Sequence, residues 1–402
     1  MGMHKRSIEE LGHQVALPLS SRVSRRTFLA GAAACAAVGS TLLRAAICEP
    51  GQQALLHVAT RDASDNAYVH TFALTSSGCT LLGSRSVDSL AAIAAHPALP
   101  VLYVARDCRQ WENLPRGVIE SYAVAYDMRP LRLLSRSPMA LSSTGPRSLA
   151  VSPCGRHLLV AASTGGAWNA FALSGGLPAS IPIARKETGA IQDVSAISLP
   201  TPHGLTFSPG RPFAAATDPG CRRMTLLQPS SNGIAVLARC QTPHGCTPSN
   251  PVWTSDGKYI ILPNAQSASL SIYEVRAVLG DGGNAGIHLL GTAPTATPVT
   301  TLLAHPAQPA VFTSRPQAGG SRLELWQLQC SHLKIVSDTW ISGNVAALAQ
   351  HAGSLWVATQ DRLTRISIGD LRSSCPFEMA LPMPGAQAMV TQTMAAPLEM
   401  PI

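Results

Sequence analysis

Short apolar runs alternate with turn residues along most of the chain, and this arrangement repeats. In each unit a short apolar strand leads into a Pro/Gly turn, a more hydrophobic strand follows, and a third, alternating strand comes after a polar loop. The clearest copies span residues 145–173, 201–227 and 247–275. Weaker or partial copies span residues 54–74, 89–124, 299–328 and 345–368. The pattern therefore predicts seven similar β-units in succession.

A repeat of roughly 40 to 55 residues with three or four strands per unit is typical of a β-propeller, because one blade cannot bury both faces of its sheet alone. We therefore predict an all-β protein with a seven-bladed β-propeller over residues 51–376. The first unit is partial, which indicates that N- and C-terminal strands complete one blade together. Residues 377–402 are interpreted as the closing strand and a Pro-rich C-terminal tail.

The N-terminal segment differs from the repeats. Arg25 and Arg26 precede an uncharged, Ala/Gly-rich run at 27–43 that is about as long as the apolar part of a signal peptide. With Thr27, Phe28 and Leu29 this segment resembles a twin-arginine export signal. We predict that residues 1–46 are an export signal with a flexible N-terminus. The product is expected to be periplasmic or secreted, without a stable membrane span after signal removal.

Charge and cysteine spacing exclude several classes of function. The formal net charge is +8, but residues 1–46 hold six Lys/Arg against two Glu, which leaves about +4 for the remainder. Without a dense Lys/Arg run there, nucleic acid is not an expected partner. No CxxC pair or zinc-like Cys/His spacing occurs, so no metal or cofactor is predicted. A disulfide between Cys240 and Cys246 is left open.

The blade that opens with Pro202-His203 has a specific set of motifs. Phe207-Ser208-Pro209 follows, and then Asp218-Pro219-Gly220 with Arg223. In this frame the chain resembles the lactonase family of seven-bladed propellers, which includes 6-phosphogluconolactonases and relatives acting on muconate-type lactones. The resemblance covers most of residues 54–375. It implies a hydrolase whose partner is a small-molecule lactone or sugar acid.

The next blade departs from that family pattern. The family's blade usually begins Gly-Pro-Arg-His and later carries Asn-Glu, whereas this chain has Thr247-Pro248-Ser249-Asn250 and Asn264-Ala265. The Arg, His and Glu positions are thus replaced by uncharged residues. A second interpretation therefore stays open: a catalytically inactive propeller that binds a ligand or a protein at its central mouth.

Lactone hydrolysis needs a base to activate water, donors for the oxyanion, and a cation for an acidic substrate. The sequence contains neither a GxSxG nor an HExxH motif, which disfavours a serine nucleophile or that type of zinc site. The predicted catalytic residues are His203, Asp218 and Asn264. The predicted substrate-binding residues are Arg147, Arg223, Asn250 and His244. Structural roles are the alternative: Asp218 and Arg223 could pair with each other, and the asparagines could serve as turn residues.

Overall fold

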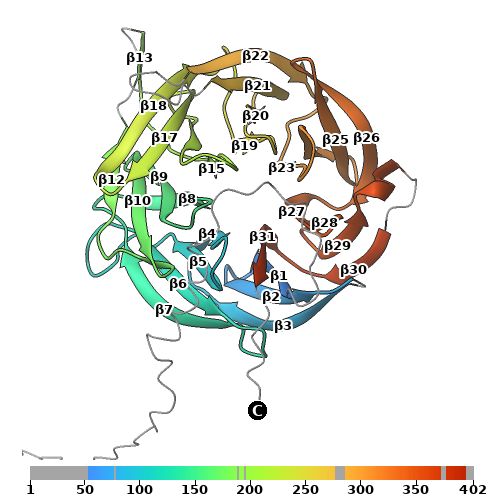
Figure 1. Cartoon of the computed structure of the whole chain (residues 1–402), viewed down its shortest axis with the longest axis horizontal. Coiled ribbons are helices and arrows are strands. Elements are labelled where there is room, and N and C mark those ends of the chain that lie inside the picture. The colour runs from blue at the N-terminus through green and yellow to red at the C-terminus, as the bar shows by residue number, and fades with distance from the viewer. Residues whose placement is uncertain are drawn as a thin grey trace, which may run out of the picture. The chain divides into compact units, whose positions relative to one another are not determined.

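The computed structural model describes residues 53–76, 78–187, 190–193, 196–276, 286–372 and 377–394. All of them belong to one compact unit, Leu43–Ile402. Their strands form seven sheets arranged in a ring, with one strand of each sheet nearest the axis (Figure 1). The protein is therefore an all-β, seven-bladed propeller, as the repeat pattern predicts. The predicted export segment at 1–46 lies outside the described residues.

The blades are given from the axis outward. Blade 1 contains β31 (Ala386–Met394), β1 (Gln53–Arg61), β2 (Ala67–Leu74) and β3 (Cys79–Ser86). Blade 2 contains β4 (Leu90–Ala95), β5 (Val101–Arg106), β6 (Val118–Val124) and β7 (Leu131–Pro138). Blade 3 contains β8 (Thr144–Val151), β9 (His157–Thr164) and β10 (Ala167–Ser174), and β10 pairs with both β11 (Leu177–Pro178) and β12 (Ile183–Lys186).

The remaining blades each have four strands. Blade 4 contains β15 (Leu205–Phe207), β16 (Ala214–Asp218), β17 (Arg223–Ser230) and β18 (Gly233–Gln241). Blade 5 contains β19 (Val252–Trp253), β20 (Tyr259–Asn264), β21 (Ser269–Arg276) and β22 (Gly286–Pro294). Blade 6 contains β23 (Thr301–Ala304), β24 (Ala310–Gln317), β25 (Gly320–Gln329) and β26 (His332–Ser342). Blade 7 contains β27 (Val345–His351), β28 (Ser354–Thr359), β29 (Arg362–Ser367) and β30 (Phe377–Pro382).

Two smaller elements lie between these strands. The hairpin β13 (Ala190–Asp193) and β14 (Ala196–Ser198) is inserted between blades 3 and 4, and the 3-10 helix η2 (Gly369–Arg372) follows β29. Within the described ranges, no helix has the length and hydropathy needed to cross a membrane.

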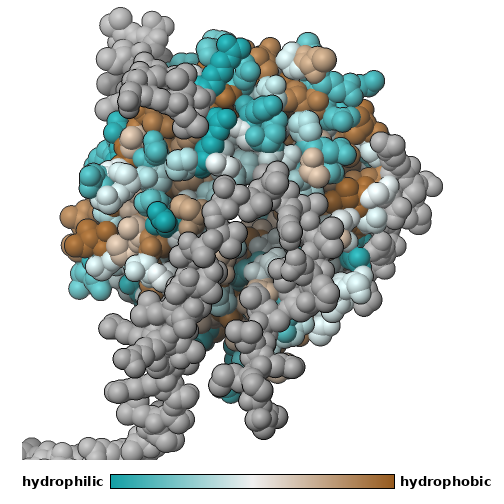
Figure 2. All heavy atoms as spheres, viewed as in Figure 1, coloured by the Kyte–Doolittle hydropathy of each residue, from teal (hydrophilic) through white to brown (hydrophobic). Residues whose placement is uncertain are grey.

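The core is divided among the interfaces between blades, because each sheet buries both of its faces. Trp168 of blade 3 and Phe207 of blade 4 share one hydrophobic cluster, and Phe312 of blade 6 and Leu355 of blade 7 share another. The run Ala214–Ala216 in β16 is fully buried, and its alternating side chains contribute to the clusters on both sides of blade 4. On the visible face, hydrophilic and hydrophobic residues are interspersed (Figure 2). The apolar stabilisation therefore comes from blade-on-blade contact.

The ring is closed by the two ends of the described chain. Strand β31 pairs antiparallel with β1, so blade 1 contains both the first and the last described strand. The buried His57 on β1 contacts Thr71 Oγ1 through Nδ1 (3.0 Å) and Gln392 Oε1 through Nε2 (3.3 Å). Gln392 Nε2 in turn donates to the Leu99 carbonyl of blade 2 (2.8 Å). We call these four residues the closure clasp. The segment after Pro376, interpreted above as closing strand and tail, also supplies β30, the outer strand of blade 7.

Each blade has its connections on two faces. The chain passes from the second to the third strand, and from one blade to the first strand of the next, on the same face. We call this the mouth face, and it carries the predicted site residues.

Candidate functional site at the mouth face

Three of the predicted site residues lie near the starts of the inner strands of blades 3, 4 and 5. Arg147 lies near the start of β8, and His203 and Asn250 lie just before β15 and β19. The backbone N–H of His203 donates to the Thr217 carbonyl (2.9 Å), which ties this connection to the end of β16. In blades 3, 4 and 5 the start of the inner strand therefore places a polar side chain at the mouth face.

Thr217 links blades 4 and 5. Its Oγ1 accepts a hydrogen bond from Gly204 N–H (3.0 Å) and donates to the Ser249 carbonyl (2.8 Å). Gly204 permits a close approach: a Cβ there would lie 2.8 Å from Asn250 Cα and 2.7 Å from Pro251 Cδ. This contact brings Asn250 beside His203, and the two side chains form a hydrogen bond.

The environment of His203 favours a neutral imidazole. Burial lowers its pKa below the usual 6.5, and the positive charge of Arg147 lowers it further, while the hydrogen bond with Asn250 acts in the opposite direction. Its Nδ1 is buried and has no hydrogen-bond partner within the described part of the chain. A neutral histidine can accept a proton at neutral pH from a water molecule that reaches one of its ring nitrogens.

Arg147 is the exposed cation of this group. Its Nε donates to Ser163 Oγ (3.2 Å), and Ser163 Oγ donates to the Gly145 carbonyl (3.0 Å). No carboxylate of the described segments forms an ion pair with Arg147. Gly145 N–H donates to Asp107 Oδ1 (3.0 Å), which fixes the backbone just before Arg147. The guanidinium is thus held at one nitrogen while its charge stays available to an anionic or carbonyl oxygen.

Asp218 and Arg223 belong to a different, buried cluster. Asp218 is 1% exposed, and its Oδ1 accepts hydrogen bonds from the N–H groups of Thr201 (2.8 Å) and Cys221 (3.1 Å). Arg223 Nη2 donates to Glu187 Oε2 (2.8 Å) and lies 3.6 Å from Asp218 Oδ2. These bonds favour a framework role for both residues, since their charges are already compensated inside the protein.

Glu187 is the central carboxylate of this cluster, and sequence reasoning missed it. It follows β12, and its carboxylate accepts bonds from Trp168 Nε1 (3.0 Å), Arg223 and Arg239 Nη2 (3.1 Å). It lies in the irregular connection between blades 3 and 4, outside the repeat frame, so neither spacing nor a motif indicated it. We call Glu187, Arg223, Asp218, Trp168 and Arg239 the blade 3–4 ion cluster.

Comparison with known proteins identifies the family to which the chain belongs. The family model described as "Lactonase, 7-bladed beta-propeller" matches residues 55–300, more than half of the chain. The chain belongs to this family. Comparison of the sequence with curated proteins gave no significant match.

Solved structures similar to this lactonase-family propeller share its fold. A "putative 6-phosphogluconolactonase" from Bacteroides uniformis is 16% identical with a TM-score of 0.69, and the match covers 85% of this chain and 99% of that one. A periplasmic gluconolactonase from Pseudomonas aeruginosa is also 16% identical, with a TM-score of 0.68 and coverage of 86% and 100%. At this identity the likeness establishes the architecture alone.

Blade 5 of this lactonase-family propeller is where the chain departs from the family pattern. Asn264, which is kept, is 1% exposed, and its Nδ2 donates to Ser269 Oγ (3.1 Å) and Ser271 Oγ (2.8 Å). Its backbone forms an isolated bridge with Pro248. These contacts favour a role in holding the blade rather than in contacting substrate.

Two further predictions concern the loop at 242–250. His244 is exposed there, and it does not join the contacts made by His203, Arg147 and Asn250. Cys240 and Cys246 are both free thiols, so the disulfide left open by the sequence is not formed. Within the described residues, no group of His, Cys, Asp and Glu side chains has the arrangement of a metal site.

Proposed function

We propose that this lactonase-family propeller hydrolyses an unphosphorylated sugar or carboxylate lactone at its mouth face. The observation that carries the proposal is the pairing of His203, whose lowered pKa keeps the imidazole neutral, with the exposed guanidinium of Arg147. A base and a cation at one place are two of the three groups that the reaction needs.

In this mechanism His203 accepts a proton from a water molecule as that water attacks the lactone carbonyl carbon. Arg147 stabilises the negative charge that forms on the carbonyl oxygen. The tetrahedral intermediate then collapses, the ring C–O bond breaks, and the imidazolium returns its proton to the leaving alkoxide. The product is the open-chain hydroxy acid, and water is the co-reactant. Asn250 keeps the imidazole in place through their hydrogen bond.

The proposed substrate is unphosphorylated because we propose that the protein acts outside the cytosol. The Arg25-Arg26 segment supports export by the twin-arginine pathway to the periplasm or beyond. An exported enzyme would not meet a phosphorylated sugar lactone made in the cytosol. The similarity to a periplasmic gluconolactonase fold is in keeping with this location.

The test is pH-stat hydrolysis of glucono-, galactono- and 6-phosphogluconolactone by the full chain, with His203→Ala and Arg147→Met as variants. Each substitution is expected to lower kcat/KM by about 10²- to 10³-fold. His288→Ala, on the exposed outer strand β22, is the matched histidine control and is expected to keep full activity. Turnover that is unchanged in His203→Ala would overturn the assignment of the base.

The uncharged blade 5 favours a second candidate, a binding propeller without catalysis. Ser249, Asn250 and Ala265 stand where the family carries charge, so a ligand there would meet neutral groups on one side and Arg147 on the other. Such a protein would bind gluconate in calorimetry, lose binding in Arg147→Met, keep it in His203→Ala, and hydrolyse none of the lactones. Lack of binding to any sugar acid would instead direct the search to a protein ligand at the mouth.

A further inference from the structure

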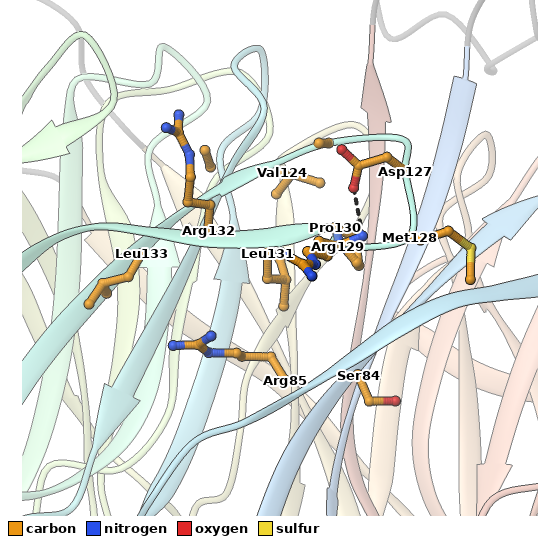
Figure 3. A pocket seen from close by; sticks show the side chains of 12 residues that line it. Ser84, Arg85, Val124, Asp127, Met128, Arg129, Pro130, Leu131, Arg132 and Leu133 are labelled. Carbon is orange, nitrogen blue, oxygen red and sulfur yellow. Dashed lines mark hydrogen bonds between the residues drawn. The ribbon is translucent and has the colours of Figure 1, made fainter. Parts of the chain in front are cut away.

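A pocket lies on the rim of the propeller, between blades 1 and 2. It has a volume of about 890 Å³, within the range of roughly 300 to 1,000 Å³ usual for small-molecule sites. Its walls come from the end of β3 and from the β6–β7 hairpin (Figure 3). None of its lining residues belongs to the mouth-face site.

Gly83 explains why the hairpin can cross the outer strand of blade 1. A Cβ at this position would lie 2.8 Å from Pro130 Cδ and 3.1 Å from the Met128 carbonyl oxygen. Only a glycine lets the hairpin backbone approach β3 so closely. The close packing of the β6–β7 hairpin on β3 therefore fixes the two walls of the pocket relative to each other.

Three arginines, Arg85, Arg129 and Arg132, are among the residues that line this rim pocket. Figure 3 shows Arg85 and Arg129 on one side of β7, whereas Arg132 points to the other side. No carboxylate of the described residues forms an ion pair with Arg85 or Arg129. Asp127 is the one carboxylate among the lining residues, and its Oδ1 accepts the backbone N–H of Arg129 (2.7 Å). The positive charge at this site is thus largely uncompensated.

The floor of the rim pocket is apolar. Val124, Leu131 and Leu133 line it, and Val124 and Leu131 belong to the hydrophobic cluster that joins blades 1 and 2. Met128 at the edge is 80% exposed, and a methionine side chain adapts readily to an apolar ligand. Arg85 lies with its guanidinium 6.0 Å from the ring centroid of Tyr122, which holds it at the wall.

We propose that the rim pocket binds a small amphipathic anion, with its carboxylate between Arg85 and Arg129 and its hydrocarbon part over Leu131, Leu133 and Met128. A medium-chain fatty acid has this chemistry. Guanidinium groups bind carboxylates by charge-assisted hydrogen bonds, and the apolar floor gains from covering a chain. This site is independent of the proposed lactone hydrolysis.

The test is calorimetric titration of the full chain with sodium decanoate below its micelle-forming concentration. Saturable binding is expected, and the double variant Arg85→Gln/Arg129→Gln should weaken it by at least about tenfold. Arg156→Gln, an exposed arginine in the turn between β8 and β9 and outside the pocket lining, is the matched control and should change the affinity by less than about twofold. Uncharged decane-1,2-diol and acetate should each bind at least about tenfold more weakly, because each lacks one half of the ligand.

Circular dichroism and the Tm of each variant establish that it is folded. Absence of saturable decanoate binding by the folded protein would overturn the proposal, as would equal binding by the double variant. If decane-1,2-diol or acetate bound as tightly as decanoate, the proposal that the pocket requires an amphipathic anion would be wrong. Binding to phosphatidylglycerol vesicles without binding of decanoate would also overturn it, because the occupant would then be a membrane surface.

Discussion

The closure clasp makes a definite prediction about acid stability. His57 is fully buried, and burial lowers its pKa from 6.5 to about 4, although its hydrogen bond with Gln392 acts against this. In the unfolded chain the same histidine protonates near 6.5. Between these values the unfolded state binds the proton and the folded state does not, so folding stability falls as the pH is lowered.

The size of the effect follows from the shift. A difference of about 2.5 pKa units corresponds to about 3 kcal/mol, present in full above pH 6.5 and lost as the pH falls toward 4. Over the part of this window from about pH 6.5 to about pH 5, His57 alone should remove about 2 kcal/mol from the free energy of unfolding.

Urea denaturation at about pH 7.5 and about pH 5 measures this, in the wild type and in His57→Gln. Glutamine is neutral at both pH values and can still contact Thr71 and Gln392, so the variant should have a flatter pH dependence by about 2 kcal/mol. The other histidines whose pKa is lowered by burial, such as His96 and His305, remain in both proteins and cancel in the difference. An identical pH dependence in the two proteins would refute the reasoning, because His57 would then titrate alike folded and unfolded.

Three further substitutions test the framework by thermal or urea unfolding. Gly385→Ala should destabilise the protein by about 3 kcal/mol, since φ is +71° there and a Cβ would lie 1.8 Å from the Arg61 carbonyl oxygen; unchanged stability would show that the β31 turn can shift freely. Arg223→Met should cost about 3 kcal/mol by removing a partner of the buried Glu187, and a loss below about 1 kcal/mol would mean that the remaining partners suffice. Trp168→Phe should cost about 1 to 2 kcal/mol by removing the indole N–H that donates to Glu187, and a neutral effect would contradict the importance of that bond.

The blade frame could be predicted from sequence because period-two patterning and turn residues are local properties. The copies at 145–173, 201–227 and 247–275 contain the first three strands of blades 3, 4 and 5. The fourth strands were less visible, because they lie at the rim and alternate poorly. In β18, for example, most side chains are only partly buried, so the apolar signal is weak.

A site residue could be predicted from the sequence only where its position in the repeat determines what its side chain contacts. Arg147 and His203 directly follow a blade-opening proline and Asn250 lies two residues after Pro248, so the repeat brings all three to one face. Asp218 and Arg223 also fit a motif, but a motif does not reveal whether a charge is already neutralised. That depends on Glu187, which the insertion between blades 3 and 4 contributes from outside the repeat.

The contrast between Arg147 and Arg223 shows why charge type alone does not identify a binding residue. Arg223 is buried, and its guanidinium is compensated by Glu187 and Asp218, so recruiting it to a ligand would leave buried carboxylates without a partner. Arg147 is exposed and held by a neutral hydroxyl, so binding an anion there breaks no ion pair among the described residues. The same property makes Arg147 lower the pKa of His203. An anionic ligand that neutralised Arg147 would remove this effect and raise the pKa of His203. In the proposed mechanism the cation would therefore attract the substrate and, together with burial, keep His203 unprotonated until the substrate arrives.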